Sequence, residues 1–225
     1  MIRTEGPYGN TGLPDLVTER WLLEAFCSKN SQLGRTGPSF GHHVLRLSKD
    51  VDLMTCRGQD LAFSVITKAL YPFLWGALPC TPWCHWQRLN LTRGNSKTVE
   101  KIMRAREESL RALEVFLRLC RAVEEVHGAI AFEWPTGIEG WQLPEVLGMI
   151  AKYNLKLVSF HGCMYQLLTP AGQLMKKGWT VATNCPELFE ALALAKCTGG
   201  HGHTTIQGGS DRIVRVLPAR YGTCR

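Results

Sequence analysis

A cysteine held between two prolines is the residue of this sequence best suited to nucleophilic chemistry. Cys80 follows an apolar run at residues 73 to 78, which we expect to be a short buried strand, and Pro79 and Pro82 flank it. Because proline rings fix the backbone φ angle, the loop should hold the thiol in one place at the carboxyl end of the strand. Ligands bind at these ends in open α/β sheets. A cysteine can also be a small packing residue, so the sequence leaves two interpretations, a nucleophile and a buried thiol.

A glutamate inside a later apolar run is the second candidate. Residues 129 to 135 read Ala-Ile-Ala-Phe-Glu-Trp-Pro, and we expect a strand that ends in an acidic, aromatic turn. Glu133 therefore lies between two aromatic residues at a strand's carboxyl end, where solvation alone explains a carboxylate poorly. We predict that Glu133 either caps the next helix or acts as a catalytic group at the edge of the sheet.

The other elements must form the sheet that positions these two residues. Apolar spacing predicts strands, helices and loops along the chain. The expected strands are 21 to 26, 43 to 47, 73 to 78, 129 to 135, 156 to 160 and 179 to 183; the helices are 61 to 70, 99 to 126, 143 to 153 and 186 to 196; the loops are 27 to 35, 52 to 60 and 80 to 96. This alternation predicts an α/β fold with a mostly parallel sheet, helices on both faces and an antiparallel closing strand pair within residues 156 to 183.

Length and composition are those of an ordinary globular domain. The chain has 225 residues, 45% of them hydrophobic and 20% charged, which is enough for one substantial core. We expect a loose leader at residues 1 to 18 and one domain at residues 19 to 225. No apolar stretch approaches the roughly 20 residues of a membrane span, and the first residues lack the apolar segment of a signal peptide. Nine cysteines are scattered along the chain and are interpreted as reduced thiols, so an intracellular location is expected.

A basic balance and a histidine-rich tail bear on partners and metals. The net charge of +7 permits a polyanionic partner such as nucleic acid. Near the carboxyl terminus, Cys197, His201 and His203 are close enough in sequence to suggest zinc. Their spacing matches none of the usual ligand pairs, and glycine-rich histidine segments are often plain loops, so no metal is assigned and the question stays open.

The order of these motifs resembles the DNA cytosine-5 methyltransferases, especially the diverged forms carried by mobile elements and phages. The resemblance lies in the Pro79-Cys80 loop, in Phe-Glu-Trp-Pro where the family has Glu-Asn-Val, and in the segments 160 to 165, 176 to 184 and 197 to 203. It extends from about residue 20 to the end of the chain. There is no room for the family's separate target-recognition domain, and its Gln-x-Arg-x-Arg segment is not recognisable.

The resemblance implies a Rossmann-like S-adenosylmethionine-dependent methyltransferase fold and methyl transfer to cytosine in nucleic acid, with DNA as the expected partner. A thiolate must add to carbon 6 of the ring before carbon 5 becomes nucleophilic, and Cys80 matches the family's cysteine. An acidic group must hydrogen-bond ring nitrogen 3, and Glu133 matches that role. A partner protein that supplies target recognition and the absence of a membrane partner are also expected.

The cofactor site implied by the resemblance lies over the carboxyl ends of the first two strands. Phe26, Ser28 and Pro79 would contact S-adenosylmethionine, Asp50 would bind the ribose hydroxyls, and Asp60 would bind the adenine. The family's glycine-rich loop, Phe-x-Gly-x-Gly-Gly, is replaced here by Phe-Cys-Ser-Lys-Asn-Ser. Cofactor binding therefore depends on a loop without the usual glycines.

Two other functions were weighed. A zinc-dependent deaminase needs Pro-Cys-x-x-Cys with an upstream His-x-Glu, whereas Cys84 is one residue too far and no His-x-Glu precedes it. The altered loop at residues 27 to 34 favours a different alternative, a non-catalytic module of the methyltransferase fold that binds nucleic acid or a partner protein.

Overall fold

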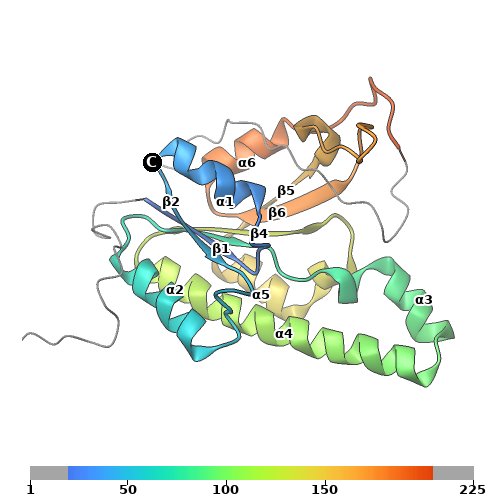
Figure 1. Cartoon of the computed structure of the whole chain (residues 1–225), viewed down its shortest axis with the longest axis horizontal. Helices are drawn as coiled ribbons and strands as arrows, with labels where there is room; N and C mark the ends of the chain where they lie inside the picture. Colours follow the sequence, from blue (N-terminus) through green and yellow to red (C-terminus); the bar gives the residue numbers. More distant parts are fainter. Residues whose placement is uncertain (1–19, 205–225) are drawn as a thin grey trace, which may run out of the picture.

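A six-stranded mixed sheet organises the computed structural model, which describes residues 20 to 204 (Figure 1). The strands are β1 (Trp21–Ala25), β2 (His43–Leu47), β3 (Phe73–Gly76), β4 (Ala129–Pro135), β5 (Lys156–His161) and β6 (Gly178–Thr183), in the order β2-β1-β3-β4-β6-β5. Strands β1 to β4 pair in parallel, and β6 is antiparallel to both of its neighbours, β4 and β5. The predicted mostly parallel sheet and its antiparallel closing pair are confirmed. The leader predicted at residues 1 to 18 lies outside the described residues.

Helices cover both faces of the sheet, as predicted. They are α1 (Gln32–Thr36), α2 (Cys56–Lys68), α3 (His85–Arg93), α4 (Ser96–Glu125), α5 (Pro144–Lys152) and α6 (Pro186–Ala193). Helices α1 and α6 lie over one face and α2, α4 and α5 over the other (Figure 1). Among residues 20 to 204, no helix is both long and apolar enough to cross a membrane.

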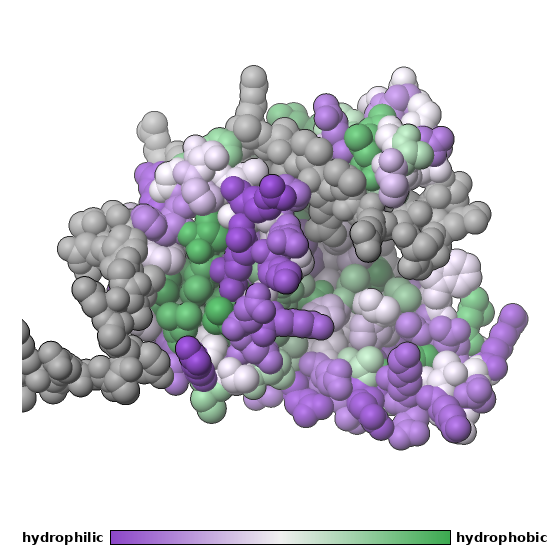
Figure 2. All heavy atoms as spheres, viewed as in Figure 1, coloured by the Kyte–Doolittle hydropathy of each residue, from purple (hydrophilic) through white to green (hydrophobic). Residues whose placement is uncertain are grey.

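Helix α4 is the largest element packed against the sheet. The Asn95 side chain accepts a hydrogen bond from the Thr98 amide at 2.9 Å and so caps the helix. Its apolar stripe is buried, with Phe116 fully enclosed, while hydrophilic residues gather on the outer edge (Figure 2). A Cβ atom on Gly76 would lie 2.5 Å from the Phe116 ring, so only glycine allows this close packing of helix and strand.

Three loop predictions were wrong, because a helix lies inside each predicted loop; hydroxyl caps start two of these helices. Helix α2 begins at Cys56, inside the predicted loop at residues 52 to 60, where the Thr55 hydroxyl accepts a hydrogen bond from the Gly58 amide. Helix α1 interrupts the predicted loop at 27 to 35. Helix α3 interrupts the one at 80 to 96; it buries none of its side chains, so it has no apolar periodicity to detect.

The order of the strands creates a crevice at the carboxyl edge of the sheet. The chain leaves β1 toward β2 on one side and returns to β3 on the other side of β1. In open α/β sheets, this change of direction separates the loops that follow the two strands and leaves a binding crevice between them. Cys80 follows β3, and Glu133 lies on the adjacent parallel strand β4, so the predicted placement of these residues on neighbouring strands is confirmed.

The loop that carries Cys80 is fastened to α4 by polar contacts. The Trp83 indole donates a hydrogen bond to the Ser109 hydroxyl at 2.8 Å, and that hydroxyl donates to the Pro79 carbonyl at 3.3 Å. The Arg106 guanidinium lies 4.8 Å from the centre of the Trp83 ring and donates to the Pro82 carbonyl at 3.2 Å. Together these contacts hold both ends of the loop against one rigid helix.

Replacing Ser109→Ala should destabilise the protein, because the buried Trp83 indole N–H would lose its hydrogen-bond acceptor. The expected loss is about 1–3 kcal/mol in the free energy of unfolding, the usual cost of an unsatisfied buried donor. Urea unfolding measures it. Ser64→Ala, at a half-buried position on α2, is the control and should change stability much less. Equal stabilities for the two variants would show that the Trp83–Ser109 contact does not fasten the loop.

Candidate active site

A cavity of about 650 Å³ lies at the carboxyl ends of β1, β3 and β4. This volume is in the range of small-molecule sites, roughly 300–1,000 Å³. The lining includes five of the seven site residues predicted from the sequence: Phe26, Ser28, Pro79, Cys80 and Glu133. The loops after β1 and β3 and the end of β4 therefore bring the nucleophile candidate, the acidic candidate and part of the predicted cofactor site into one space.

Asp50 and Asp60 do not line this cavity. Asp50 is exposed three residues after β2, and Asp60 is exposed on α2. Helix α2 covers the face of the sheet opposite to α1, whereas residues at the start of α1 form part of the cavity wall. The ribose and adenine roles of Asp50 and Asp60 stay predictions. The structure does not bring these two carboxylates to the cavity that contains the other five predicted site residues.

The loop after β1 turns sharply at its first residue. Phe26 has a φ of 59°, a left-handed conformation that is rare for a bulky residue. The Ser28 hydroxyl then accepts a hydrogen bond from the Asn30 amide at 3.1 Å, and the Ser31 hydroxyl accepts one from the Gly34 amide at 3.4 Å. No residue from 27 to 31 has a positive φ. This loop therefore keeps its course along the cavity without glycines.

Glu24 is a site residue that sequence reasoning missed. It lies in the middle of β1, lines the cavity and is only 4% exposed. Burial, helped by the nearby Glu133, raises the pKa of its carboxyl group to about 7, although a hydrogen bond donated by the Ser31 hydroxyl and the charge of Arg46 oppose the shift. An acidic residue inside an apolar strand run was the available signal, because such a carboxyl group must be buried on one face of the sheet.

The thiols around the cavity differ in reactivity. Burial raises the pKa of Cys27 to about 12, which leaves it protonated at neutral pH. Burial also raises the pKa of Cys80, whereas the Lys177 ammonium group lowers it. Cys84 is half-buried and does not line the cavity. A cationic group opposes the effect of burial at both cysteines that line the cavity, Arg46 at Cys27 and Lys177 at Cys80, but only at Cys80 is it the largest opposing effect, so Cys80 is the stronger nucleophile candidate.

Aromatic side chains form much of the remaining wall. Trp75, Phe160, Tyr165 and Trp179 line the cavity, and the Lys177 ammonium group lies 4.0 Å from the centre of the Trp179 ring. Flat rings suit the stacking of a planar heterocycle. These residues could not be predicted as site residues from the sequence, because isolated aromatic positions on different strands give no local motif.

A second group of reactive side chains lies outside the cavity lining. Possible metal-binding atoms of Cys163, Cys197, His201 and His203 all lie within 4.8 Å of one another. Cys163 was not part of the sequence motif, because 34 residue positions separate it from Cys197. Cys163 and Cys197 are free thiols. Cys185 is disulfide-bonded, so the interpretation of all cysteines as reduced thiols is wrong at that residue.

Replacing Glu24→Gln should stabilise the protein at alkaline pH. The folded-state pKa of about 7 lies above the ordinary value of 4.5. Between these values the folded protein retains a proton that the unfolded chain has lost, so stability falls as pH rises through this window and the full cost is present above pH 7. The shift corresponds to about 3 kcal/mol.

Thermal unfolding at pH 5 and pH 8 measures this effect. The Glu24→Gln variant should gain stability over the wild type at pH 8 and gain much less at pH 5. Glu100→Gln, an exposed residue of α4 paired with Arg104, is the control and should show no such difference. A Glu24→Gln variant with the same stability difference at both pH values would contradict the raised pKa.

No protein-family model, curated protein or solved structure matches this chain. The functional argument therefore depends on the residues that the fold brings together.

Proposed function

We propose that this protein transfers a methyl group from S-adenosylmethionine to cytosine in nucleic acid, with DNA as the expected substrate, through a covalent adduct on Cys80. The observation that carries the proposal is the meeting of Cys80 and Glu133 in one cavity at the carboxyl edge of the sheet. The sequence resemblance implies both residue types in this order. A mostly parallel sheet with one reversed strand, as the methyltransferase fold requires, supports it further.

The charge of the cavity suits a cationic cofactor. S-adenosylmethionine supplies the methyl group and carries a positive charge on its sulfur atom. Glu24 and Glu133 both line the cavity, and the charge of Glu133 contributes to the raised pKa of Glu24. A cation bound near Glu24 would favour the ionised form of that carboxyl group. Ser28 and Asn30 also line the cavity and offer hydroxyl and amide groups to a polar ligand.

Cys80 and Glu133 would divide the work on the cytosine ring. The Cys80 thiol loses its proton to solvent and its sulfur forms a bond to carbon 6, while the protonated carboxyl group of Glu133 donates a hydrogen bond to ring nitrogen 3, so electron density builds at carbon 5. Carbon 5 takes the methyl group and then loses its proton to a water molecule, and the bond between sulfur and carbon 6 breaks to release the Cys80 thiolate. Because burial raises the pKa of the Cys80 thiol, a cationic cofactor nearby should promote attack by lowering that pKa.

Helix α3 supports a nucleic-acid substrate. It begins five residues after Cys80 and projects from the sheet beside the amino-terminal end of α4 (Figure 1). Its nine residues include His85, Arg88 and Arg93 and no acidic residue. Trp86 is 73% exposed on this helix. Exposed aromatic rings next to cationic side chains are typical of surfaces that bind single-stranded or unpaired bases.

Covalent trapping tests the proposed function. An oligonucleotide that contains 5-fluorocytosine should become attached to the protein in the presence of S-adenosylmethionine, because fluorine at carbon 5 blocks the loss that would release Cys80. Mass spectrometry of the intact protein detects the adduct. Cys80→Ser should abolish it, and Cys84→Ser, which changes a thiol outside the cavity lining, should leave it unchanged.

Cofactor binding separates this proposal from the non-catalytic alternative. A bound cofactor at a hundredfold excess over its dissociation constant should stabilise the fold by roughly 2–3 kcal/mol, seen as a higher melting temperature. A protein that binds the oligonucleotide, shows no shift with S-adenosylmethionine and forms no adduct would be a binding module of the same fold, and the proposed reaction would be wrong.

Replacing Trp86→Ala should weaken nucleic-acid binding without reducing stability. Loss of one base-stacking contact is worth about 1–3 kcal/mol, or roughly a 5- to 150-fold increase in Kd. Fluorescence anisotropy with a single-stranded oligonucleotide at fixed salt measures it. Tyr71→Ala is the control, because Tyr71 is 62% exposed just before β3, at the opposite edge of the sheet. Equal affinities for the two variants would exclude α3 from the interface.

A further inference from the structure

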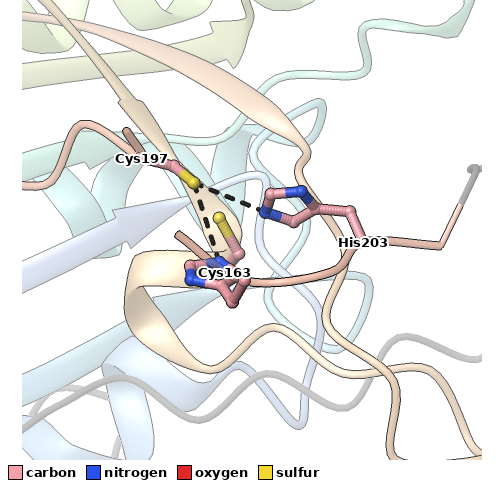
Figure 3. A group of neighbouring side chains, drawn as sticks. Cys163, Cys197 and His203 are labelled. Carbon is pink, nitrogen blue, oxygen red and sulfur yellow. Dashed lines mark hydrogen bonds between the residues drawn. The ribbon is translucent and has the colours of Figure 1, made fainter. Parts of the chain in front are cut away.

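Two cysteines and two histidines from distant parts of the chain meet beside the candidate active site (Figure 3). Cys163 lies in the short helix η5 (Gly162–Tyr165) between β5 and β6, whereas Cys197, His201 and His203 follow α6. Figure 3 shows the thiols of Cys163 and Cys197 and the ring of His203 turned toward one another. Both cysteines are buried and both histidines are half-buried. The fold therefore completes a set of four ligands of which the sequence motif shows three.

The distances within this cluster match the edges of a tetrahedral metal site. Zinc binds sulfur at about 2.3 Å and imidazole nitrogen at about 2.0–2.1 Å, so a tetrahedral site separates sulfur from nitrogen by about 3.6 Å. The Cys197 sulfur lies 3.6 Å from Nε2 of His201 and 3.4 Å from Nε2 of His203. The four ligand atoms can thus surround one ion with small adjustments.

The backbone around Cys197 holds its side chain in place. The Gly199 amide donates a hydrogen bond to the Cys197 sulfur at 3.4 Å. Gly199 has a φ of 92°, which glycine adopts readily. The Cys197 amide in turn donates to Nδ1 of His161 at 3.0 Å, which fixes the direction of the segment.

We propose that Cys163, Cys197, His201 and His203 bind one structural zinc ion. Two thiolates and two imidazoles in tetrahedral reach are the ligand set that selects zinc over the harder cations. Because the protein would fill all four positions, the site is closed and serves the fold. This inference does not depend on the proposed methyl transfer.

The ion would fasten the end of the described chain to one wall of the cavity. Gly162 and Tyr165, at the two ends of η5, line the cavity on either side of Cys163. The segment after α6 is rich in glycine, and the Thr204 amide donates a hydrogen bond to the Leu174 carbonyl at 2.9 Å. With few apolar side chains to pack, metal ligation would be the main constraint on this segment.

Metal analysis of the full chain, expressed without a polyhistidine tag, tests this proposal. Inductively coupled plasma mass spectrometry should find about one zinc per chain in the wild type. The Cys163→Ser and His203→Gln variants should lose most of this zinc. Cys56→Ser, which changes an exposed free thiol on α2, should keep the zinc. Removal of the ion with a chelator should lower the melting temperature of the wild type.

Cobalt substitution tests the metal site in the wild-type protein, without any variant. Apoprotein titrated with Co²⁺ should develop the visible bands of a tetrahedral site with thiolate charge transfer, and one equivalent of Zn²⁺ should remove them. If the wild-type protein contains no zinc and its apo form also gives no such bands with Co²⁺, the proposal is wrong. Equal zinc contents in the His203→Gln and Cys56→Ser variants would overturn it as well. None of these measurements uses nucleic acid or S-adenosylmethionine, so failure here leaves the proposed reaction unaffected.

Discussion

The contact between the Cys80 loop and α4 is the constraint on which the candidate site depends. The loop leaves β3 at the edge of the sheet, where a polypeptide is free to move unless side chains hold it. Trp83 inserts its indole beside α4, with its ring N–H satisfied by Ser109 and its face covered by Arg106. Arg106 also pairs with Glu139 at 3.0 Å, beyond the end of β4. One helix therefore positions the loop after β3, which carries Cys80, and the loop after β4, the strand that carries Glu133.

The cavity wall contains a buried carboxyl group, Glu24, whose burial costs free energy. Glu24 is enclosed between neighbouring strands, with Arg46 opposite it on β2 and Trp75 opposite it on β3. A packed apolar residue would stabilise β1 more, since a carboxyl group whose pKa is raised by burial costs free energy at neutral pH. Retaining a destabilising acidic group at the mouth of a crevice is typical of functional sites.

Most of the architecture was accessible from the sequence because it follows from apolar periodicity. The β2 and β4 boundaries agree with prediction to the residue, and α4 was expected from its stripe. Helix α3 was missed because it has no buried face, and α1 because a hydroxyl cap and five residues give no periodic signal. Cys80 and Glu133 could be found because each follows or ends a recognisable strand. Glu24 and Cys163 could not be assigned roles, because their significance comes from partners brought close only by the sheet.

The two sides of the cavity differ in how much apolar packing stabilises them. The side formed by β1, β3 and β4 continues into the main apolar core, where Phe116, Phe132 and Trp134 are fully buried. The opposite side, around η5, packs on a second and smaller apolar cluster that includes Phe160, Trp179 and Leu188, and a glycine-rich segment follows α6 beside it. Burial of apolar area scales with the number of side chains enclosed, so the η5 wall gains less from packing than the β3–β4 wall does. A cross-link therefore adds more, relative to packing, at the η5 wall, just as cross-links matter most in small domains with a limited core. The cysteine and histidine cluster is located at this weaker wall, and it is there that a cross-link contributes most to the shape of the cavity.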